Sequence, residues 1–255
     1  MLDLGGKTIL VTGASRGIGA AIAHTLGANG AAVVAHFGGD RAGAEAALDN
    51  VPGDRKRFIE ADLAKAAGVD ALWNEAVEWK GGVDVLVNNA ALMRWHGGFG
   101  ASDEDWDAVW AETLAVNVLA PARLIRRMTP HFRARGGGIL VTLSSWAAQR
   151  GVTNPDTIAY AASKAAVKAM TQTVARAYAA ENILAYIIAP GVVRTRMSED
   201  FAATQGGEDK VTAGLAMREW VPPDDIANLV AFLATGKARH LSGATLDVNG
   251  ATYIR

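Results

Sequence analysis

Short apolar runs recur along the chain, and the intervals between them leave room for helices. The runs occupy residues 8–11, 31–35, 57–59, 83–87, 139–143, 185–189 and 245–248. Short runs that are apolar on both faces are typical of strands buried in a parallel sheet. The intervals carry helical periodicity, as at Ile226, Leu229, Val230 and Leu233. The pattern predicts a doubly wound, Rossmann-type α/β fold, with a seven-stranded, mainly parallel sheet and helices on both faces.

The chain shows no internal division. No Pro- or Ser-rich linker interrupts its 255 residues, and no repeat is visible beyond the rhythm of strand and helix. We therefore expect a single domain over residues 1–255. Within it, the stretch 195–221 is polar and contains Gly206 and Gly207, which is typical of a mobile lid that closes on a substrate.

The composition excludes several classes of protein. The absence of Cys rules out a disulfide scaffold, a thiolate metal site and a cysteine nucleophile, and we expect no metal. The 25 basic and 26 acidic residues form no basic block, so a nucleic-acid partner is not expected. The first residues lack the basic region of a signal peptide, and no apolar stretch is long enough to span a membrane. These features predict a cytoplasmic protein without a membrane partner.

A glycine-rich segment connects the first predicted strand to the first predicted helix. Residues 12–19 read Thr-Gly-Ala-Ser-Arg-Gly-Ile-Gly. Backbone N–H groups and the helix dipole at such a junction favour an anion, and glycine lets a pyrophosphate approach the backbone. The spacing differs from the general dinucleotide fingerprint, so a plain tight turn is the alternative. The flanking strand and helix favour a cofactor site.

Tyr160 and Lys164 stand at positions i and i+4 of an alanine-rich helical stretch, so they share one face. A phenol has a pKa of about 10, and a nearby ammonium group favours its ionised form. The pair could therefore exchange protons at working pH. The alternative is a half-buried Tyr beside a solvated Lys, and the spacing alone favours that alternative, because such a pair is common.

Six motifs in this order resemble the short-chain dehydrogenases/reductases in their single-domain form. They are the turn at 12–19, the Asn-Asn-Ala at 88–90, Asn117, the Ser pair at 144–145, the Tyr160 and Lys164 pair, and the Pro-Gly at 190–191. The resemblance covers essentially the whole chain. It implies an enzyme that transfers a hydride between a nicotinamide cofactor and its substrate.

The resemblance also implies catalytic roles for four residues. Tyr160 would protonate a carbonyl oxygen in reduction, or act as the base in oxidation. Lys164 would tune the pKa of Tyr160 and bind the nicotinamide ribose. Ser145, rather than its neighbour in the pair, would hold the substrate oxygen. Asn117 would hold a water that links Lys164 to solvent, although an Asn that only bends a helix fits the same position.

The same resemblance places the cofactor residues. They are Gly13, Ser15, Arg16, Gly17, Ile18, Gly19, Phe37, Asp62, Leu63, Asn89, Ala90, Pro190, Gly191, Val193 and Thr195, together with Tyr160 and Lys164. Asp62 would read the adenine amino group, with a helix cap as the alternative. Phe37 fills the position at the end of the second strand where NAD-dependent members place Asp, and Arg16 and Arg41 are candidates to meet a 2′-phosphate. We therefore expect NADP(H) in preference to NAD(H).

Three tryptophans fall in segments that should border the active site. Trp95, Trp146 and Trp220 could contact a planar substrate, or they could pack loops onto the core. The alanines that follow Tyr160 permit close helix packing, and the resemblance implies a homo-oligomer, either a tetramer or a dimer.

The chain is thus predicted to be an NADP(H)-dependent oxidoreductase that interconverts a carbonyl and a secondary alcohol. One alternative is an NAD-dependent sugar or alcohol dehydrogenase of the same family. Another keeps the cofactor for epimerisation or dehydration. A non-enzymatic alternative is a cofactor-binding sensor or interaction protein.

Overall fold

A computed structural model describes residues 2–255 and contains one seven-stranded sheet, all of whose pairings are parallel. Its order is β3-β2-β1-β4-β5-β6-β7. The strands are β1 (Thr8–Val11), β2 (Ala32–Phe37), β3 (Lys56–Glu60), β4 (Val85–Asn88), β5 (Gly138–Leu143), β6 (Ile183–Pro190) and β7 (Thr245–Val248). The predicted doubly wound fold is confirmed.

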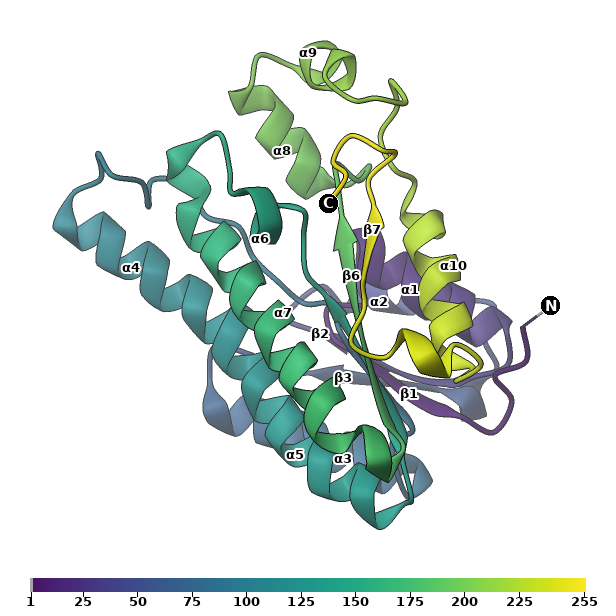
Figure 1. Cartoon of the computed structure of the whole chain (residues 1–255). Coiled ribbons are helices and arrows are strands. Elements are labelled where there is room, and N and C mark those ends of the chain that lie inside the picture. Colours follow the sequence, from purple (N-terminus) through teal and green to yellow (C-terminus); the bar gives the residue numbers. More distant parts are fainter. Residues whose placement is uncertain (1) are drawn as a thin grey trace.

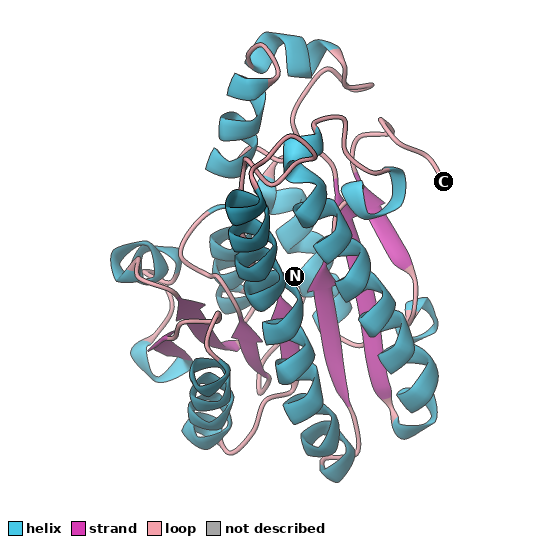
Figure 2. Ribbon diagram, turned by 90° about the vertical axis from the view of Figure 1, so that its left-hand side faces the viewer, coloured by secondary structure: helices cyan, strands magenta, loops and turns pink. Residues whose placement is uncertain are grey.

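Helices cover both faces of the sheet (Figures 1 and 2). They are α1 (Gly17–Ala28), α2 (Arg41–Ala47), α3 (Ala66–Lys80), α4 (Asp103–Leu114), α5 (Ala120–Ala134), α6 (Ala147–Arg150), α7 (Ile158–Tyr178), α8 (Arg196–Thr204), α9 (Glu208–Ala213) and α10 (Pro223–Ala234). One apolar core lies between the sheet and α1 with α10, and a second lies under α3, α5 and α7. All eight residues of β6 are buried, because helices flank both of its faces.

The helices α4 and α5 are joined without a break by a π-helical turn, η2 (Ala115–Leu119). The combined helix, residues 103–134, is long and apolar enough to cross a membrane by length and composition, a test that core helices of soluble proteins also pass. It lies beside α7 and, through α5, against the sheet (Figure 1). Its buried residues include Leu124, Met128 and Phe132, so part of its apolar surface belongs to the core.

The predicted lid, residues 195–221, contains α8 and α9 and lies beyond the carboxyl ends of the strands (Figure 1). A small apolar cluster joins the lid residues Ala202, Leu215 and Trp220 to Val192, which precedes the lid. Nothing in the structure shows it moving, so its role as a lid stays a prediction.

Candidate active site

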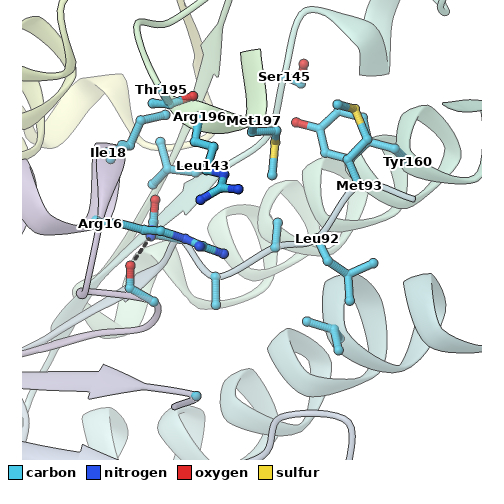
Figure 3. Close-up of a pocket in the computed structure, with 18 of the residues that line it drawn as sticks. Arg16, Ile18, Leu92, Met93, Leu143, Ser145, Tyr160, Thr195, Arg196 and Met197 are labelled. Carbon is cyan, nitrogen blue, oxygen red and sulfur yellow. Dashed lines mark hydrogen bonds between the residues drawn. The ribbon is translucent and has the colours of Figure 1, made fainter. Parts of the chain in front are cut away.

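A cavity of about 630 Å³ opens at the carboxyl ends of the strands, where the strand order reverses between β1 and β4. In doubly wound folds, ligands bind at this edge of the sheet. The turn between β1 and α1, the ends of β4, β5 and β6, the start of α7 and the start of α8 all contribute to its wall (Figure 3).

The three glycines of the first turn are small for different reasons. Gly13 and Gly17 have φ values of +69° and +54°, a left-handed conformation that favours glycine. At Gly19 a Cβ atom would lie 1.9 Å from the Gly13 carbonyl oxygen, so this glycine lets α1 pack against its own turn. Gly19 thus shapes the cradle, in addition to lining the cavity.

The turn is held in place by the end of β4. The Asn89 side chain donates to the carbonyl oxygens of Thr12 and Gly13 at 2.9 and 3.0 Å. In return, the Thr12 hydroxyl accepts from the backbone N–H groups of Asn89 and Ala90 at 3.0 and 3.1 Å. These bonds fix the distance between the glycine-rich turn and the segment after β4. From the sequence alone, Thr12 has no role beyond its place in the glycine-rich motif, and the structure shows that it connects the turn to the segment after β4.

His36 connects three strand ends at the same edge of the cavity. Its Nδ1 accepts from the Gly13 N–H at 3.0 Å, which leaves Nε2 to donate to the Ala61 carbonyl at 3.0 Å. Burial lowers the pKa of His36, which favours this neutral form. Sequence reasoning missed His36, and a cavity position for it could have been read from the alternation of side chains along β2.

Phe37 does not line the cavity, so its assignment as a cofactor residue is wrong. Its side chain is buried with 1% exposure, whereas its neighbours His36 and Gly38 border the cavity. Successive side chains of a strand point to opposite faces, which turns Phe37 away when His36 faces the site. The end of β2 nevertheless presents no carboxylate to the cavity, because neither His36 nor Gly38 is acidic.

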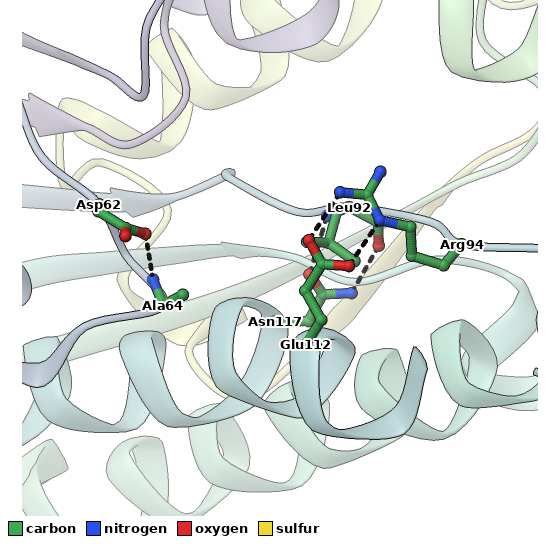
Figure 4. A network of polar contacts seen from close by, with 6 residues as sticks. All are labelled: Asp62, Ala64, Leu92, Arg94, Glu112 and Asn117. Atoms are coloured by element: carbon green, nitrogen blue, oxygen red, sulfur yellow. Dashed lines mark hydrogen bonds and ion pairs between the residues drawn. The ribbon is translucent and has the colours of Figure 1, made fainter. Parts of the chain in front are cut away.

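Asp62 and Leu63 line the cavity after β3. The Asp62 carboxylate accepts from the Ala64 N–H at 3.0 Å (Figure 4). It also pairs with Lys65 at 3.1 Å. The Ala64 hydrogen bond is the main reason that the pKa of Asp62 lies below its ordinary value. The carboxylate therefore stabilises its own turn, and reading of an adenine amino group stays a prediction.

Ser145 and Tyr160 lie together in the wall of the cavity (Figure 3), and Lys164 also lines it. Burial raises the pKa of Tyr160, and the nearby Ser145 hydroxyl opposes that rise. The Lys164 ammonium donates to the Leu143 carbonyl at 2.9 Å and lies 5.6 Å from the centre of the Tyr160 ring. The phenol and the serine hydroxyl are thus positioned to share one substrate oxygen.

The expected lowering of the Tyr160 pKa is wrong for this structure. Lys164 is buried and Tyr160 is half-buried, and burial disfavours the charged form of each. It lowers the pKa of Lys164 to about 8 while it raises that of Tyr160. Tyr160 is therefore a neutral phenol at neutral pH, a state suited to donating a proton.

Asn117 lies in the π-helical turn and does not itself line the cavity. Its Oδ1 accepts from the Leu92 N–H at 2.9 Å, and its Nδ2 donates to the Leu92 carbonyl at 2.8 Å (Figure 4). The Nδ2 also donates to Ser163 at 3.0 Å. It thereby ties the segment after β4 to α7. The π-helical turn at Asn117 agrees with the helix-bending alternative, and the water relay stays a prediction.

The opposite wall is formed after β6. Pro190, Gly191, Val193 and Thr195 all line the cavity, as the resemblance implies. Thr195 caps α8 by accepting from the Ser198 N–H. A Cβ atom on Gly17 would lie 3.1 Å from the Thr195 methyl group, so the start of α8 rests on the glycine-rich turn.

Of the three tryptophans, Trp95 alone lines the cavity, so the assignments of Trp146 and Trp220 to the substrate are wrong. Trp220 is buried with 3% exposure, and its Nε1 donates to Thr212 at 2.8 Å. Trp146 packs against the apolar cluster of the lid. Both therefore attach the lid to the domain, and sequence position alone does not reveal this packing.

Sequence reasoning also missed Met93 and Met197, which line the cavity near Tyr160 (Figure 3).

Comparisons with known proteins agree with this geometry. Residues 13–251 match a family described as enoyl-(acyl carrier protein) reductase. The chain is 34% identical over 250 residues to the 3-oxoacyl-[acyl-carrier-protein] reductase FabG of Staphylococcus epidermidis. The aligned region spans 97% of this chain and 99% of that protein. It is 35% identical over 253 residues to 3beta-hydroxysteroid dehydrogenase 1 of Eggerthella lenta, with 97% and 94% covered.

Solved structures give the same result. The crystal structure of 3-ketoacyl-(acyl-carrier-protein) reductase from Brucella melitensis with NADH is 30% identical, has a TM-score of 0.85, and covers 99% of this chain and 100% of that one. A dehydrogenase/reductase from Sinorhizobium meliloti 1021 is 34% identical, has a TM-score of 0.86, and covers 99% and 97%.

The fold and the cavity define an NAD(P)-dependent oxidoreductase that acts on a carbonyl or alcohol group. The chain belongs to the short-chain dehydrogenase/reductase family.

Proposed function

We propose that the protein is an NADP(H)-dependent oxidoreductase that interconverts an apolar ketone and the corresponding secondary alcohol, with Tyr160 as general acid and base. The observation that carries this proposal is that the Tyr160 and Ser145 hydroxyl groups lie near each other in the wall of the cavity (Figure 3). Two hydroxyl groups placed in this way can both reach one carbonyl oxygen.

The neutral phenol suits the direction of reduction. Ser145 holds the carbonyl oxygen, and Tyr160 donates its proton to that oxygen as negative charge develops. The nicotinamide, when bound, supplies the hydride. Lys164, with a pKa of about 8, carries its proton at neutral pH and stabilises the phenolate that Tyr160 becomes after donation. In oxidation the same groups act in reverse.

The residues around the turn fit a dinucleotide. The first turn of α1 has no side-chain cap and no acidic residue, which leaves its N–H groups free for an anion. We propose that the cofactor contacts every residue assigned to it in the sequence analysis, from Gly13 to Thr195, except Phe37, which does not line the cavity. Asp62 and Leu63 would contact the adenine end, and Pro190 and Gly191 the nicotinamide end.

We infer a preference for NADP(H) from the charges at the adenosine end. Arg16 lines the cavity, and among the described residues its side chain has no ion pair within 4.0 Å. The nearest acid in sequence beyond β2 is Asp40, whose carboxylate accepts from Gly43 N–H at 2.9 Å as the cap of α2. A 2′-phosphate would therefore meet a guanidinium group, which suits it.

Replacing Arg16 with Gln should weaken NADPH binding roughly ten- to a hundredfold and leave NADH binding nearly unchanged, since only NADPH carries the 2′-phosphate. Isothermal titration with both cofactors measures the effect. Arg41→Gln is the matched control, because Arg41 pairs with Glu45 at 2.8 Å and does not line the cavity. Tighter binding of NADH than of NADPH by the unaltered protein would contradict the preference.

The apolar substrate is inferred from the wall beside Tyr160. Leu92, Met93, Trp95 and Met197 border the cavity there, and Trp95 stacks on Phe201 of α8 at 6.4 Å between ring centres. These four side chains are largely apolar, which favours a ketone with apolar substituents. The related 3-oxoacyl reductase and 3beta-hydroxysteroid dehydrogenase are named for largely apolar substrates, which supports the same class.

A spectrophotometric screen of ketones and secondary alcohols with both cofactors tests the proposal. Apolar ketones should be reduced with NADPH, and sugars should react poorly. Product formed without a net change in nicotinamide absorbance would indicate epimerisation or dehydration instead. Cofactor binding without oxidation on any carbonyl would indicate a sensor.

We also propose that the protein is a cytoplasmic homo-oligomer, a dimer or a tetramer, formed through α4 and α7. These helices lie side by side, and α7 exposes Ala162, Ala165 and Ala169 along one strip. Leu119 in the adjoining η2 turn is 63% exposed. Light scattering should give a multiple of 26.6 kDa, and Ala165→Arg should lower it towards that mass. A monomer mass for the unaltered protein would contradict the oligomer.

A further inference from the structure

Two arginines enter the cavity from different segments. Arg16 comes from the glycine-rich turn and Arg196 from the first residue of α8 (Figure 3). Within residues 2–255, neither side chain has an ion pair within 4.0 Å. Two like charges in one cavity repel each other unless an anion lies between or beside them. The pair therefore indicates a site for more than one anionic group.

Among the other charged side chains of the cavity wall, Arg94, Glu112 and Asp62 have ion-pair partners, and Lys164 donates to the Leu143 carbonyl. Arg94 forms a bidentate pair with Glu112, at 2.7 Å for each bond (Figure 4). Asp62 pairs with Lys65. Asp200 also lines the cavity and stands four residues after Arg196 on α8, but the two groups are not within ion-pair distance. Arg196 thus remains available to a ligand.

The position of Arg196 indicates which anion it meets. Its neighbour Thr195 contacts the glycine-rich turn at Gly17, the first residue of α1. Arg196 therefore begins α8 beside the uncapped N-terminus of α1, where a phosphate group is favoured. Arg16, as the residue before α1, is the candidate for the separate 2′-phosphate.

We propose that Arg196 binds the pyrophosphate of the dinucleotide and so attaches the lid helix α8 to the bound cofactor. The inference rests on the proposed dinucleotide site and adds a contact from the lid. One guanidinium group from the lid then complements the backbone N–H groups of α1 on the same anion. Arg196 serves NADH and NADPH equally, because both contain the pyrophosphate, whereas Arg16 serves NADPH alone.

The two roles separate when fragments of the cofactor are used as probes. ADP-ribose carries the pyrophosphate without a 2′-phosphate, and 2′-AMP carries a 2′-phosphate without the pyrophosphate. Arg196→Gln should weaken ADP-ribose and NADH roughly ten- to a hundredfold in isothermal titration and leave 2′-AMP unchanged. Arg16→Gln should show the reverse pattern. Arg196→Lys should recover part of the lost affinity, since it keeps the charge without the planar fork.

Arg194→Gln is the control from the same segment. Arg194 pairs with Glu208 at 2.8 Å, lies 4.8 Å from the centre of the Trp220 ring and does not line the cavity. It should leave every probe unchanged, and thermal unfolding should show all variants folded.

Unchanged ADP-ribose binding by Arg196→Gln would overturn the assignment of Arg196. A loss of 2′-AMP binding in that variant would overturn it as well, since Arg196 would then bind the 2′-phosphate. Failure of the unaltered protein to bind any dinucleotide would instead overturn the proposed function on which the inference rests.

Discussion

Replacing Tyr160 with Phe should reduce the rate of ketone reduction by roughly 10²–10⁴ and leave the affinity for NADPH nearly unchanged. The substitution keeps the aromatic ring and removes only the hydroxyl that contacts Ser145. Burial raises the pKa of this hydroxyl, so at neutral pH the variant loses a proton donor rather than a base. Turnover at saturating substrate and cofactor, with cofactor titration in parallel, measures both effects.

Tyr178→Phe is the matched control for this experiment. Tyr178 ends the same helix, α7, but lies outside the cavity, where the Arg133 guanidinium is 6.0 Å from its ring centre. This variant should keep full turnover. If Tyr160→Phe reduced ketones as fast as the unaltered protein, another group would have to protonate the substrate oxygen, and the proposed mechanism would be wrong.

The fold could be predicted because its signal is repeated along the chain. Most of the strands are separate apolar runs, and β6 illustrates the cause, since burial of its two faces leaves only apolar side chains and Tyr186 in Ile183–Pro190. An error at one boundary does not alter the order of strands and helices. For this reason the seven strands and their parallel pairing followed from the sequence, although several bounds shifted by one or two residues.

The motifs also placed most of the candidate site, because four of the six lie at the ends of strands, where the topology brings them to one edge. Single side chains were harder to place. At β2 the cavity faces His36 rather than Phe37, and a displacement of one residue along a strand reverses the side that faces the ligand. Trp220 was misplaced for another reason, since contacts within the lid bury it.

The charge states of the site depend on contacts between segments that are distant in sequence. Lys164 donates to the carbonyl of Leu143 on β5, and the same burial that allows this bond lowers the pKa of Lys164 to about 8. The spacing of Tyr160 and Lys164 on one helix gave no indication of that environment. It predicted that the two groups are neighbours, and the surrounding strands then determined the direction of both pKa shifts.

Replacing Gly19 with Ala should weaken dinucleotide binding on the order of a hundredfold, because a misplacement of about 1 Å in a binding site can have an effect of that size. The added methyl group would lie 1.9 Å from the Gly13 carbonyl oxygen and 2.4 Å from the Asn89 side chain. A backbone carbonyl cannot rotate away, so either the turn or the start of α1 must move. The free energy of unfolding should also fall by about 1–3 kcal/mol from overpacking.

Gly27→Ala separates the loss of stability from the loss of binding. Gly27 belongs to the same helix, and its added methyl group would lie 2.4 Å from a methyl group of Val51, in the core and away from the cavity. A side-chain methyl can shift, and the turn is not touched. Gly27→Ala should therefore lower the unfolding midpoint in denaturant and still bind ADP-ribose normally, whereas Gly19→Ala should lose both. If Gly19→Ala bound ADP-ribose as tightly as the unaltered protein, close packing of α1 on its turn would not be what shapes the pyrophosphate cradle.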